Sequence, residues 1–148
     1  MSFADRGQEL FLQGYNCSQS VAGAFCKVVE MPLETMLKMA APFGGGFGRL
    51  REVCGACSGM MIITGLLYGY STPEEGEQKG KHYALVRELL DKFKEQNRSI
   101  ICREILNFRA EERGNPTERT PEFYKSRPCV RCVRDACDIL EAYINNNK

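Results

Sequence analysis

The chain reads CGACSGMMIITGLLY from Cys54 to Tyr68, and this stretch contains no charged side chain. Its length and uniformly apolar character predict a helix that is buried on all sides. Two glycine pairs in and after the stretch are spaced four residues apart: Gly55/Gly59 and Gly65/Gly69. Small residues at that spacing let two backbones approach closely, and close packing has to offset the roughly 1 kcal/mol that each glycine costs a helix. We expect the central helix of the domain or the seam of a dimer.

Helical patterns flank this stretch on both sides, and we find no strand pattern. Helices are expected at residues 4–13, 17–29, 33–41, 72–97, a short helix carrying Cys102 after Ser99, and 127–144. Asn16 is a suitable N-cap for the helix that begins at Cys17. The polar segment 109–127 is expected to be a long loop, which is often functional. The sequence therefore predicts an all-α fold in which residues 1–148 form a single compact bundle of about six helices, with a Gly-rich loop before the central helix.

Apolar positions at helical spacing predict the faces that pack on the core. They are Leu10, Phe11, Val21, Ala24, Phe25, Val28, Leu33, Met36, Leu37, Ala40, Tyr83, Val86, Leu89, Leu90, Phe93, Val133, Ile139, Leu140 and Tyr143. Charge is uneven, because residues 1–70 hold 10 charged side chains and residues 71–148 hold the other 29. The first half is therefore apolar and Gly-rich, and the second half is a set of solvated helices.

Composition excludes several classes of function. The net charge of +1 gives no electrostatic reason to expect a nucleic acid or an anionic membrane as partner. The longest apolar stretch, residues 60–67, is too short to span a bilayer. The first residues lack the basic and apolar regions of a secretory signal, so we expect a cytoplasmic protein. In that reducing compartment, cysteines serve as thiols, metal ligands or transient disulfides.

Eight cysteines and a single histidine place any soft-metal or redox chemistry on thiolates. Cys17, Cys54, Cys102 and Cys129 each lie near an expected helix start. The partial positive charge of a helix N-terminus lowers the pKa of a thiol. Four such helix ends could converge on one anionic object, such as a cluster or a thiolate-bound metal.

Cys57 and Cys132 complete two Cys-x-x-Cys pairs, with Cys54 and Cys129 respectively. The pairs are separated by 71 residues, whereas zinc sites of this kind usually place them about 15–20 residues apart. A thioredoxin-like site needs strands, and covalent haem needs a histidine directly after the second cysteine. By spacing alone a metal or cluster site, thiol–disulfide chemistry and unrelated structural cysteines all stay open. Cys26 and Cys137 are expected in the core.

The glycines of residues 44–48 are Gly44, Gly45, Gly46 and Gly48. No nucleotide-binding pattern is present, so the simplest interpretation is a tight turn before the central helix. Alternatively, these glycines contribute to a cofactor site, where their N–H groups would donate to cluster sulfurs or thiolates. Arg49 and Arg51 flank the turn and suit either an anionic site or the surface. His82 is expected on the surface of a charged helix.

Three strings occur in order: Gly14-Tyr15-Asn16-Cys17-Ser18-Gln19, then Gly44-Gly45-Gly46-Phe47-Gly48-Arg49 running into Cys54-Gly55-Ala56-Cys57-Ser58-Gly59, then Cys102-Arg103-Glu104-Ile105-Leu106. With Cys129 before Val133-Arg134-Asp135-Ala136, they resemble the redox-active family labelled C_GCAxxG_C_C. The resemblance implies a small helical bacterial protein with a redox-active metal centre. It places the family cysteines at Cys17, Cys54, Cys102 and Cys129, with Cys132 as the alternative for the last position. Cys57 falls at a variable position of the motif.

These observations favour a metal site of Cys17, Cys54, Cys102 and Cys129, with Cys57 and Cys132 as alternates. It would hold an iron–sulfur cluster or another metal ion, without covalent haem, and exchange electrons with a redox partner protein. A thiol–disulfide protein that uses its Cys-x-x-Cys pairs is the second hypothesis. A non-catalytic helical binding module is the third. No residue indicates enzymatic turnover, and a homodimer through the Gly-rich half is considered.

Overall fold

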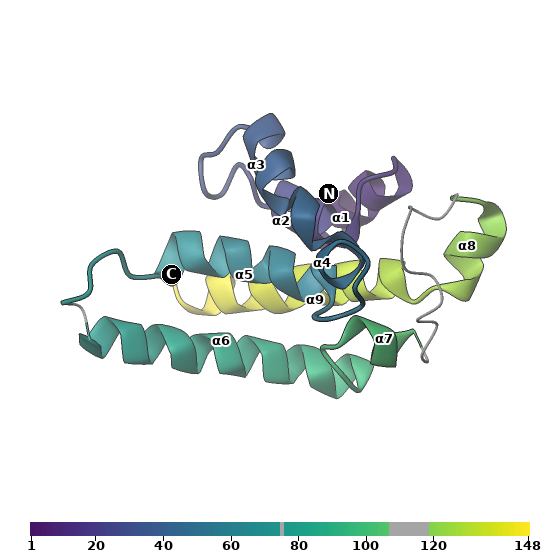
Figure 1. The fold of residues 1–148 in the computed structure, drawn as a ribbon. Coiled ribbons are helices and arrows are strands. Elements are labelled where there is room, and N and C mark those ends of the chain that lie inside the picture. Colours follow the sequence, from purple (N-terminus) through teal and green to yellow (C-terminus); the bar gives the residue numbers. More distant parts are fainter. Residues whose placement is uncertain (75, 107–118) are drawn as a thin grey trace.

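The computed structural model describes residues 1–74, 76–106 and 119–148, and within them the fold is all-α (Figure 1). The helices are α1 (Phe3–Leu12), α2 (Cys17–Ala24), α3 (Leu33–Ala40), the 3-10 turn η1 (Ala41–Phe43), α4 (Gly44–Phe47), α5 (Gly55–Tyr68), α6 (Gly76–Asn97), α7 (Cys102–Ile105), α8 (Pro121–Ser126) and α9 (Cys129–Asn146). Six of these described helices have eight or more residues, in agreement with the expected bundle.

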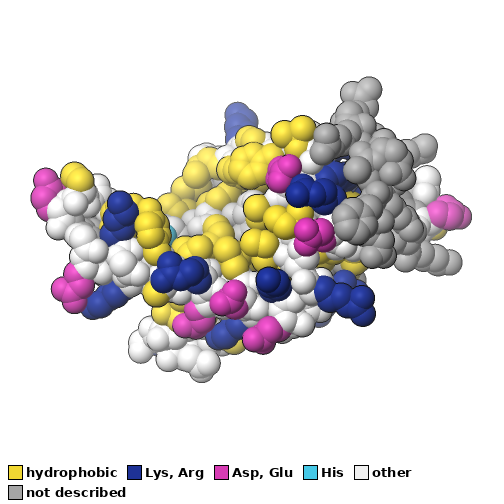
Figure 2. Space-filling view, turned by 60° about the horizontal axis from the view of Figure 1, so that its bottom comes forward, with side chains coloured by type: hydrophobic (Ala, Val, Ile, Leu, Met, Phe, Trp, Pro, Cys, Tyr) yellow, Lys and Arg dark blue, Asp and Glu magenta, His cyan; other side chains and the backbone are white. Residues whose placement is uncertain are grey.

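The long helices α5, α6 and α9 lie alongside one another, and α1, α2 and α3 cover the side of α5 and α9 that faces away from α6 (Figure 1). The starts of α5 and α9 are at the same end of the bundle, next to α4 and α7. No described helix is long and apolar enough to cross a membrane. On the face seen in Figure 2, hydrophobic side chains gather over the upper middle, and most charged side chains lie below and to the right of them.

Helix α5 packs closely on α2, as its first glycine pair predicts. A Cβ added to Gly59 would lie 2.6 Å from the carbonyl oxygen of Ser18, and one added to Gly55 would lie 3.2 Å from the Cβ of Cys17. Gly65 differs, because a Cβ there would meet nothing within 4 Å. Of the two pairs, the first therefore sets a close contact between two described helices, α5 and α2.

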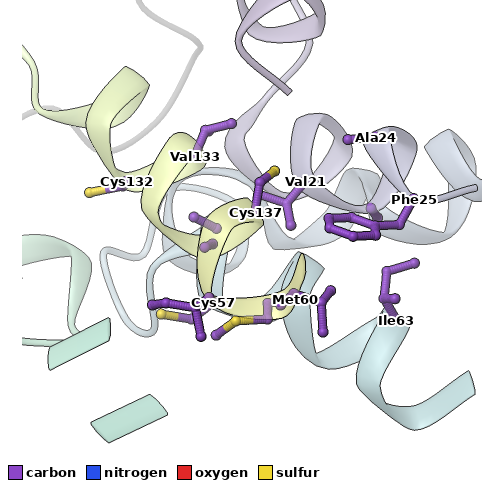
Figure 3. Close-up of a cluster of buried hydrophobic side chains, with 14 of the residues drawn as sticks. Val21, Ala24, Phe25, Cys57, Met60, Ile63, Cys132, Val133 and Cys137 are labelled. Atoms are coloured by element: carbon purple, nitrogen blue, oxygen red, sulfur yellow. The ribbon is translucent and has the colours of Figure 1, made fainter. Parts of the chain in front are cut away.

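The core lies between α2, α5 and α9, and Figure 3 shows its side chains. Cys137 is turned into this core, whereas Cys132 points to the opposite side of α9. Cys26 and Cys137 are both buried in the core, as expected from the sequence. Cys57 and Met60 of α5 pack in the same cluster.

Four expectations about helix bounds and faces are wrong. Helix α6 begins at Gly76 rather than at residue 72, because residues 72–74 form a bend and a turn before it. Helix α2 ends at Ala24 rather than near residue 29, and tight turns follow it up to Glu30 at φ +56°. Val28 is consequently 36% exposed rather than part of a helical apolar stripe. Tyr83 is 47% exposed rather than packed on the core, and its hydroxyl lies 3.2 Å from that of Tyr70.

The expected loop over residues 109–127 also needs correction. Residues 121–126 form the helix α8, which a first-turn proline and acid favour. The part of that expectation that falls on residues 109–118 lies outside the described residues.

Candidate functional site

A cavity of about 390 Å³ lies at the end of the bundle where the helix starts gather. Cys17 and Cys129 are the first residues of α2 and α9, Cys102 is the first residue of α7, and Cys54 is the N-cap of α5. All four line the cavity, together with Cys132. The expected positions at helix starts are confirmed, and the four cysteines are brought to one place.

A short antiparallel bridge between Val53 and Ile101 positions two of these cysteines. The N–H of Cys54 donates to the carbonyl oxygen of Ile100 at 2.7 Å. The N–H of Cys102 donates to the carbonyl oxygen of Glu52 at 2.6 Å. Two segments that are distant in sequence are thereby joined directly before each cysteine. The bridge fixes the starts of α5 and α7 next to each other.

Asn16 fixes Cys17 at the cavity. Its side chain accepts a hydrogen bond from the N–H of Gln19 at 2.9 Å, and the Gln19 side chain accepts from the N–H of Asn16 at 3.0 Å. This reciprocal capping box starts α2 at Cys17, as the sequence predicts. The Asn16 amide also donates to the carbonyl oxygen of Ala41 at 3.1 Å, which ties the helix start to the segment before α4.

The electrostatics around Cys54 favour its thiolate. Hydrogen bonding with the side chains of Cys132 and Cys57, and with the N–H groups of Ala56 and Cys57, holds the pKa of Cys54 well below its ordinary value. Burial opposes this effect but is weaker. The pKa values of the two donating thiols are raised in turn, since each thiol is held protonated as a donor.

A second pair of interacting cysteines, Cys17 and Cys129, joins the start of α2 to the start of α9. The thiol of Cys17 donates to Cys129, which lowers the pKa of Cys129 and raises that of Cys17. The positive charges of Arg127 and Arg119 lower the pKa of Cys129 further. Cys54 and Cys129 are thus the two lining sulfurs that are stabilised as thiolates.

Cys102 has a different environment. Burial raises the pKa of its thiol most, and the nearby Cys54 raises it further. The Arg51 guanidinium opposes both effects by donating to the Cys102 sulfur at 3.7 Å. In the metal-free chain Cys102, like Cys17 and Cys132, is therefore favoured as a protonated thiol.

The segment before α5 is a left-handed turn. Residues 45–49 all have φ between +56° and +72°, and Arg51 follows at +62°. Glycine adopts this conformation freely, whereas Phe47, Arg49 and Arg51 each pay about 1–2 kcal/mol. The tight turn expected from the glycines is therefore present, but three side chains are held in it at an energetic cost.

The turn contributes to the cavity only in part. Gly44, Gly45 and Gly48 line the cavity, whereas Gly46 packs against the backbone of Arg51 and is buried. The N–H groups of residues 48–52 donate to carbonyl oxygens of residues 42–47. These five N–H groups are used within the turn, and of the four glycines only Gly48 is among their donors.

Four arginines line the cavity with the cysteines: Arg49, Arg51, Arg119 and Arg127. The first two flank the glycine turn, and the structure places them at the site rather than on the surface. Arg119 donates to the carbonyl oxygens of Phe11 and Tyr15, both at 2.9 Å, and its guanidinium lies over the Phe11 ring. Sequence reasoning missed Arg119 and Arg127. The adjacency of Arg127 to the Pro128–Cys129 helix start was the available signal.

Several candidate residues lie elsewhere. Cys57 is fully buried behind Cys54 and does not line the cavity. His82 lies on α6 and packs edge-on against the ring of Tyr70, which follows α5. It does not line the cavity with the cysteines. Within residues 1–74, 76–106 and 119–148, no group of three or more His, Cys, Asp or Glu side chains is arranged to hold a metal ion. The five lining sulfurs and their thiolate-stabilising contacts nevertheless have the donor chemistry that a thiophilic centre requires.

Comparison with curated proteins and with solved structures finds no match. Comparison with family profiles does find one, described as "Putative redox-active protein (C_GCAxxG_C_C)", and the match covers residues 15–143. The matched region includes every cysteine that lines the cavity and the whole left-handed turn. The chain therefore belongs to the C_GCAxxG_C_C family of redox-active proteins.

Proposed function

We propose that this redox-active protein binds an iron–sulfur cluster or another thiophilic metal through Cys17, Cys54, Cys102 and Cys129, with Cys132 and Cys57 as alternate ligands. The observation that carries the proposal is that four helix starts from distant parts of the chain deliver these cysteines to one cavity. When bound, such a centre supplies one-electron transfer to and from a redox partner protein.

The chain's own residues prepare the site for such a centre. Cys54 and Cys129 are stabilised as thiolates, and a thiolate is the form that ligates a metal. Arg51 and Arg127 place positive charge next to the sulfurs, which favours a more negative centre. The cavity volume of about 390 Å³ is many times the roughly 30 Å³ share of a water molecule, so it accommodates a group of several atoms. None of the eight cysteines forms a disulfide bond, which suits the proposed cytoplasmic location.

The experiment is metal and acid-labile sulfide analysis of protein purified without oxygen, with a visible absorption spectrum. Near-stoichiometric iron and sulfide, with a broad band that bleaches on reduction, supports a cluster. Cys17→Ala is expected to lose most of the bound metal, whereas Cys26→Ala is the matched control from the adjacent core and keeps it. Protein that stays colourless and metal-free after anaerobic reconstitution with iron and sulfide rejects the proposal.

A second candidate function is thiol–disulfide exchange, favoured by the hydrogen-bonded thiols. Cys54 is a stabilised thiolate, and hydrogen bonding with the neighbouring Cys57 and Cys132 side chains lowers its pKa. A thiolate with neighbouring thiols can attack a disulfide and then be resolved. This function requires reversible oxidation without metal, and Cys54→Ser would abolish it. Reduction of a model disulfide by the metal-free protein distinguishes it from electron transfer through a metal centre.

A further inference from the structure

A buried amide connects the end of α6 to the cysteines. Asn97 is the last residue of α6 and is only 4% exposed. Its Nδ2 donates to the carbonyl oxygen of Phe93 at 3.2 Å and to Asp135 of α9 at 3.1 Å. Its Oδ1 accepts from the Nε of Arg131 at 3.0 Å and from the thiol of Cys132 at 3.7 Å. These bonds fill the two donor and two acceptor positions of the amide.

The partners of Asn97 fix the direction in which its amide faces. If the oxygen and nitrogen were exchanged, the oxygen would meet the Phe93 carbonyl and the Asp135 carboxylate, which are both acceptors. The nitrogen would then meet the Nε–H of Arg131, which is a donor. The network therefore assigns the oxygen to the side of Cys132. A buried network with every member satisfied holds one arrangement of its side chains.

The amide oxygen limits what the Cys132 sulfur can do. A thiol that donates to an oxygen keeps its proton, whereas a metal ligand is a thiolate. A thiolate at Cys132 would turn its lone pairs toward those of the Asn97 oxygen, and that contact is unfavourable. Cys129 is the first residue of α9, and its sulfur contacts Cys17 of α2 instead. The two cysteines of this Cys-x-x-Cys pair therefore have different partners.

We propose that Asn97 is a positioning residue of the cysteine site, whose amide oxygen holds the Cys132 thiol outside the ligand set. The last ligand position is then left to Cys129. The inference rests on the proposed function for the metal itself, and it adds the residue that decides between the two cysteines of α9. If Asn97 only ties α6 to α9, its substitution changes stability but not the choice of ligand.

The experiment titrates Co²⁺ into the reduced full-length protein without oxygen and follows the thiolate-to-cobalt charge-transfer absorbance. Cobalt is the probe because thiolates bind it as they bind other thiophilic metals. Cys129→Ala should lose most of the bound cobalt, since Asn97 holds Cys132. Adding Asn97→Leu to Cys129→Ala should restore cobalt binding in part, because the released Cys132 sulfur can replace the missing ligand. Loss of a purely structural contact cannot supply a ligand.

The matched control is Asn97→Asp in the same Cys129→Ala background. Aspartate keeps an oxygen toward Cys132 but places its charge against the carboxylate of Asp135, so it disturbs the contact between helices at least as much as leucine does. It should not restore cobalt. The inference is overturned if Cys129→Ala alone keeps its cobalt, if Asn97→Leu restores none, or if aspartate restores as much as leucine.

A second measurement does not depend on metal. Iodoacetamide modifies the reduced, metal-free protein for a limited time, and peptide mass mapping gives the rate of modification at Cys132. This rate should rise about threefold or more in Asn97→Leu, because the thiol loses a hydrogen bond. Asp135→Ala removes a different bond of the same amide and should leave the rate unchanged.

The two measurements separate this inference from the metal proposal. Equal rates at Cys132 in Asn97→Leu and wild type overturn the inference, whatever the chain binds. A faster rate in Asn97→Leu but not in Asp135→Ala, in a chain that takes up neither cobalt nor iron and sulfide, upholds the hold of Asn97 on Cys132 and rejects the metal proposal.

Discussion

Val53 faces Ile101 across an antiparallel bridge, and the residue after each of them is a cysteine of the cavity. Backbone pairing fixes the two strands relative to each other more tightly than side-chain packing alone, because the donors and acceptors must align. The separation of Cys54 and Cys102 is therefore set before any ligand binds.

The bridge depends on a serine next to it. Ser99 is buried, and its hydroxyl accepts from the N–H of Ile101 at 2.9 Å and donates to Glu104 at 2.6 Å. Ser99→Ala should lower the free energy of unfolding by about 1–2 kcal/mol in urea denaturation, because both partners lose a hydrogen bond. Ser71→Ala, at an exposed position, is the control. Equal stability of the two variants would contradict this role of Ser99.

Replacing either of two glycines of α5 by alanine should change the free energy of unfolding in opposite directions. Gly59→Ala should lower the free energy of unfolding by about 1–3 kcal/mol, because the new Cβ would lie 2.6 Å from a backbone oxygen of α2. Gly65→Ala should raise it by up to about 1 kcal/mol, since its Cβ meets open space and alanine favours a helix. Thermal unfolding measures both. A loss of stability in Gly65→Ala would point to a contact with a second copy of the chain.

Arg98 ends α6 in the left-handed conformation, with φ +71° and an exposed side chain. Arg98→Gly should stabilise the protein by about 1 kcal/mol, because glycine relieves that strain at a helix end. For a chain of this size we expect a rise in Tm of about 2–4 °C. Arg98→Ala keeps the strain and should not raise Tm. A rise of equal size in both variants would attribute the gain to the lost charge instead.

Oxidation of the metal-free protein should first join Cys17 to Cys129. Cys129 is a stabilised thiolate and Cys17 is the thiol in contact with it. Peptide mapping after limited oxidation identifies the bond, and Cys26 and Cys137 should stay reduced because they lie in the core. A Cys129–Cys132 bond as the first product would show that the Cys-x-x-Cys pair reacts in preference to the contact between helices.

Metal loading should raise the stability of the whole chain, because the proposed ligands come from the starts of α2, α5, α7 and α9. At a free ligand concentration 100 times Kd, a ligand that binds only the folded state adds about 2.7 kcal/mol. The metal-loaded protein should therefore unfold at a higher temperature than the chelated protein, and Cys17→Ala should show a smaller difference. An identical Tm with and without metal would argue against ligands from several helices.

The helix starts and their cysteines could be predicted because they depend on local sequence. Asn16 and Gln19 form a capping box within four residues, and the glycine run 44–48 demands a tight turn. These signals do not require knowledge of tertiary contacts. The all-α class follows from them and from the long apolar stretch of α5.

Other features depend on tertiary contacts that periodicity cannot report. Tyr83 fits a helical stripe, but its ring lies at an outer end of α6, where Lys79 and Tyr70 surround it. The meeting of Arg127 with the left-handed turn joins opposite halves of the chain. The left-handed φ of Arg49 could not be predicted from the sequence either, because arginine rarely adopts that conformation.

The distance along the chain between the two sides of the cavity limits when the cavity can form. Arg119 binds the backbone of Phe11 across 108 residues, and Cys129 meets Cys17 from a helix that begins still later. During synthesis on the ribosome, the first cysteines emerge long before their partners. The cavity is complete only after α9 has been translated and docked on α2.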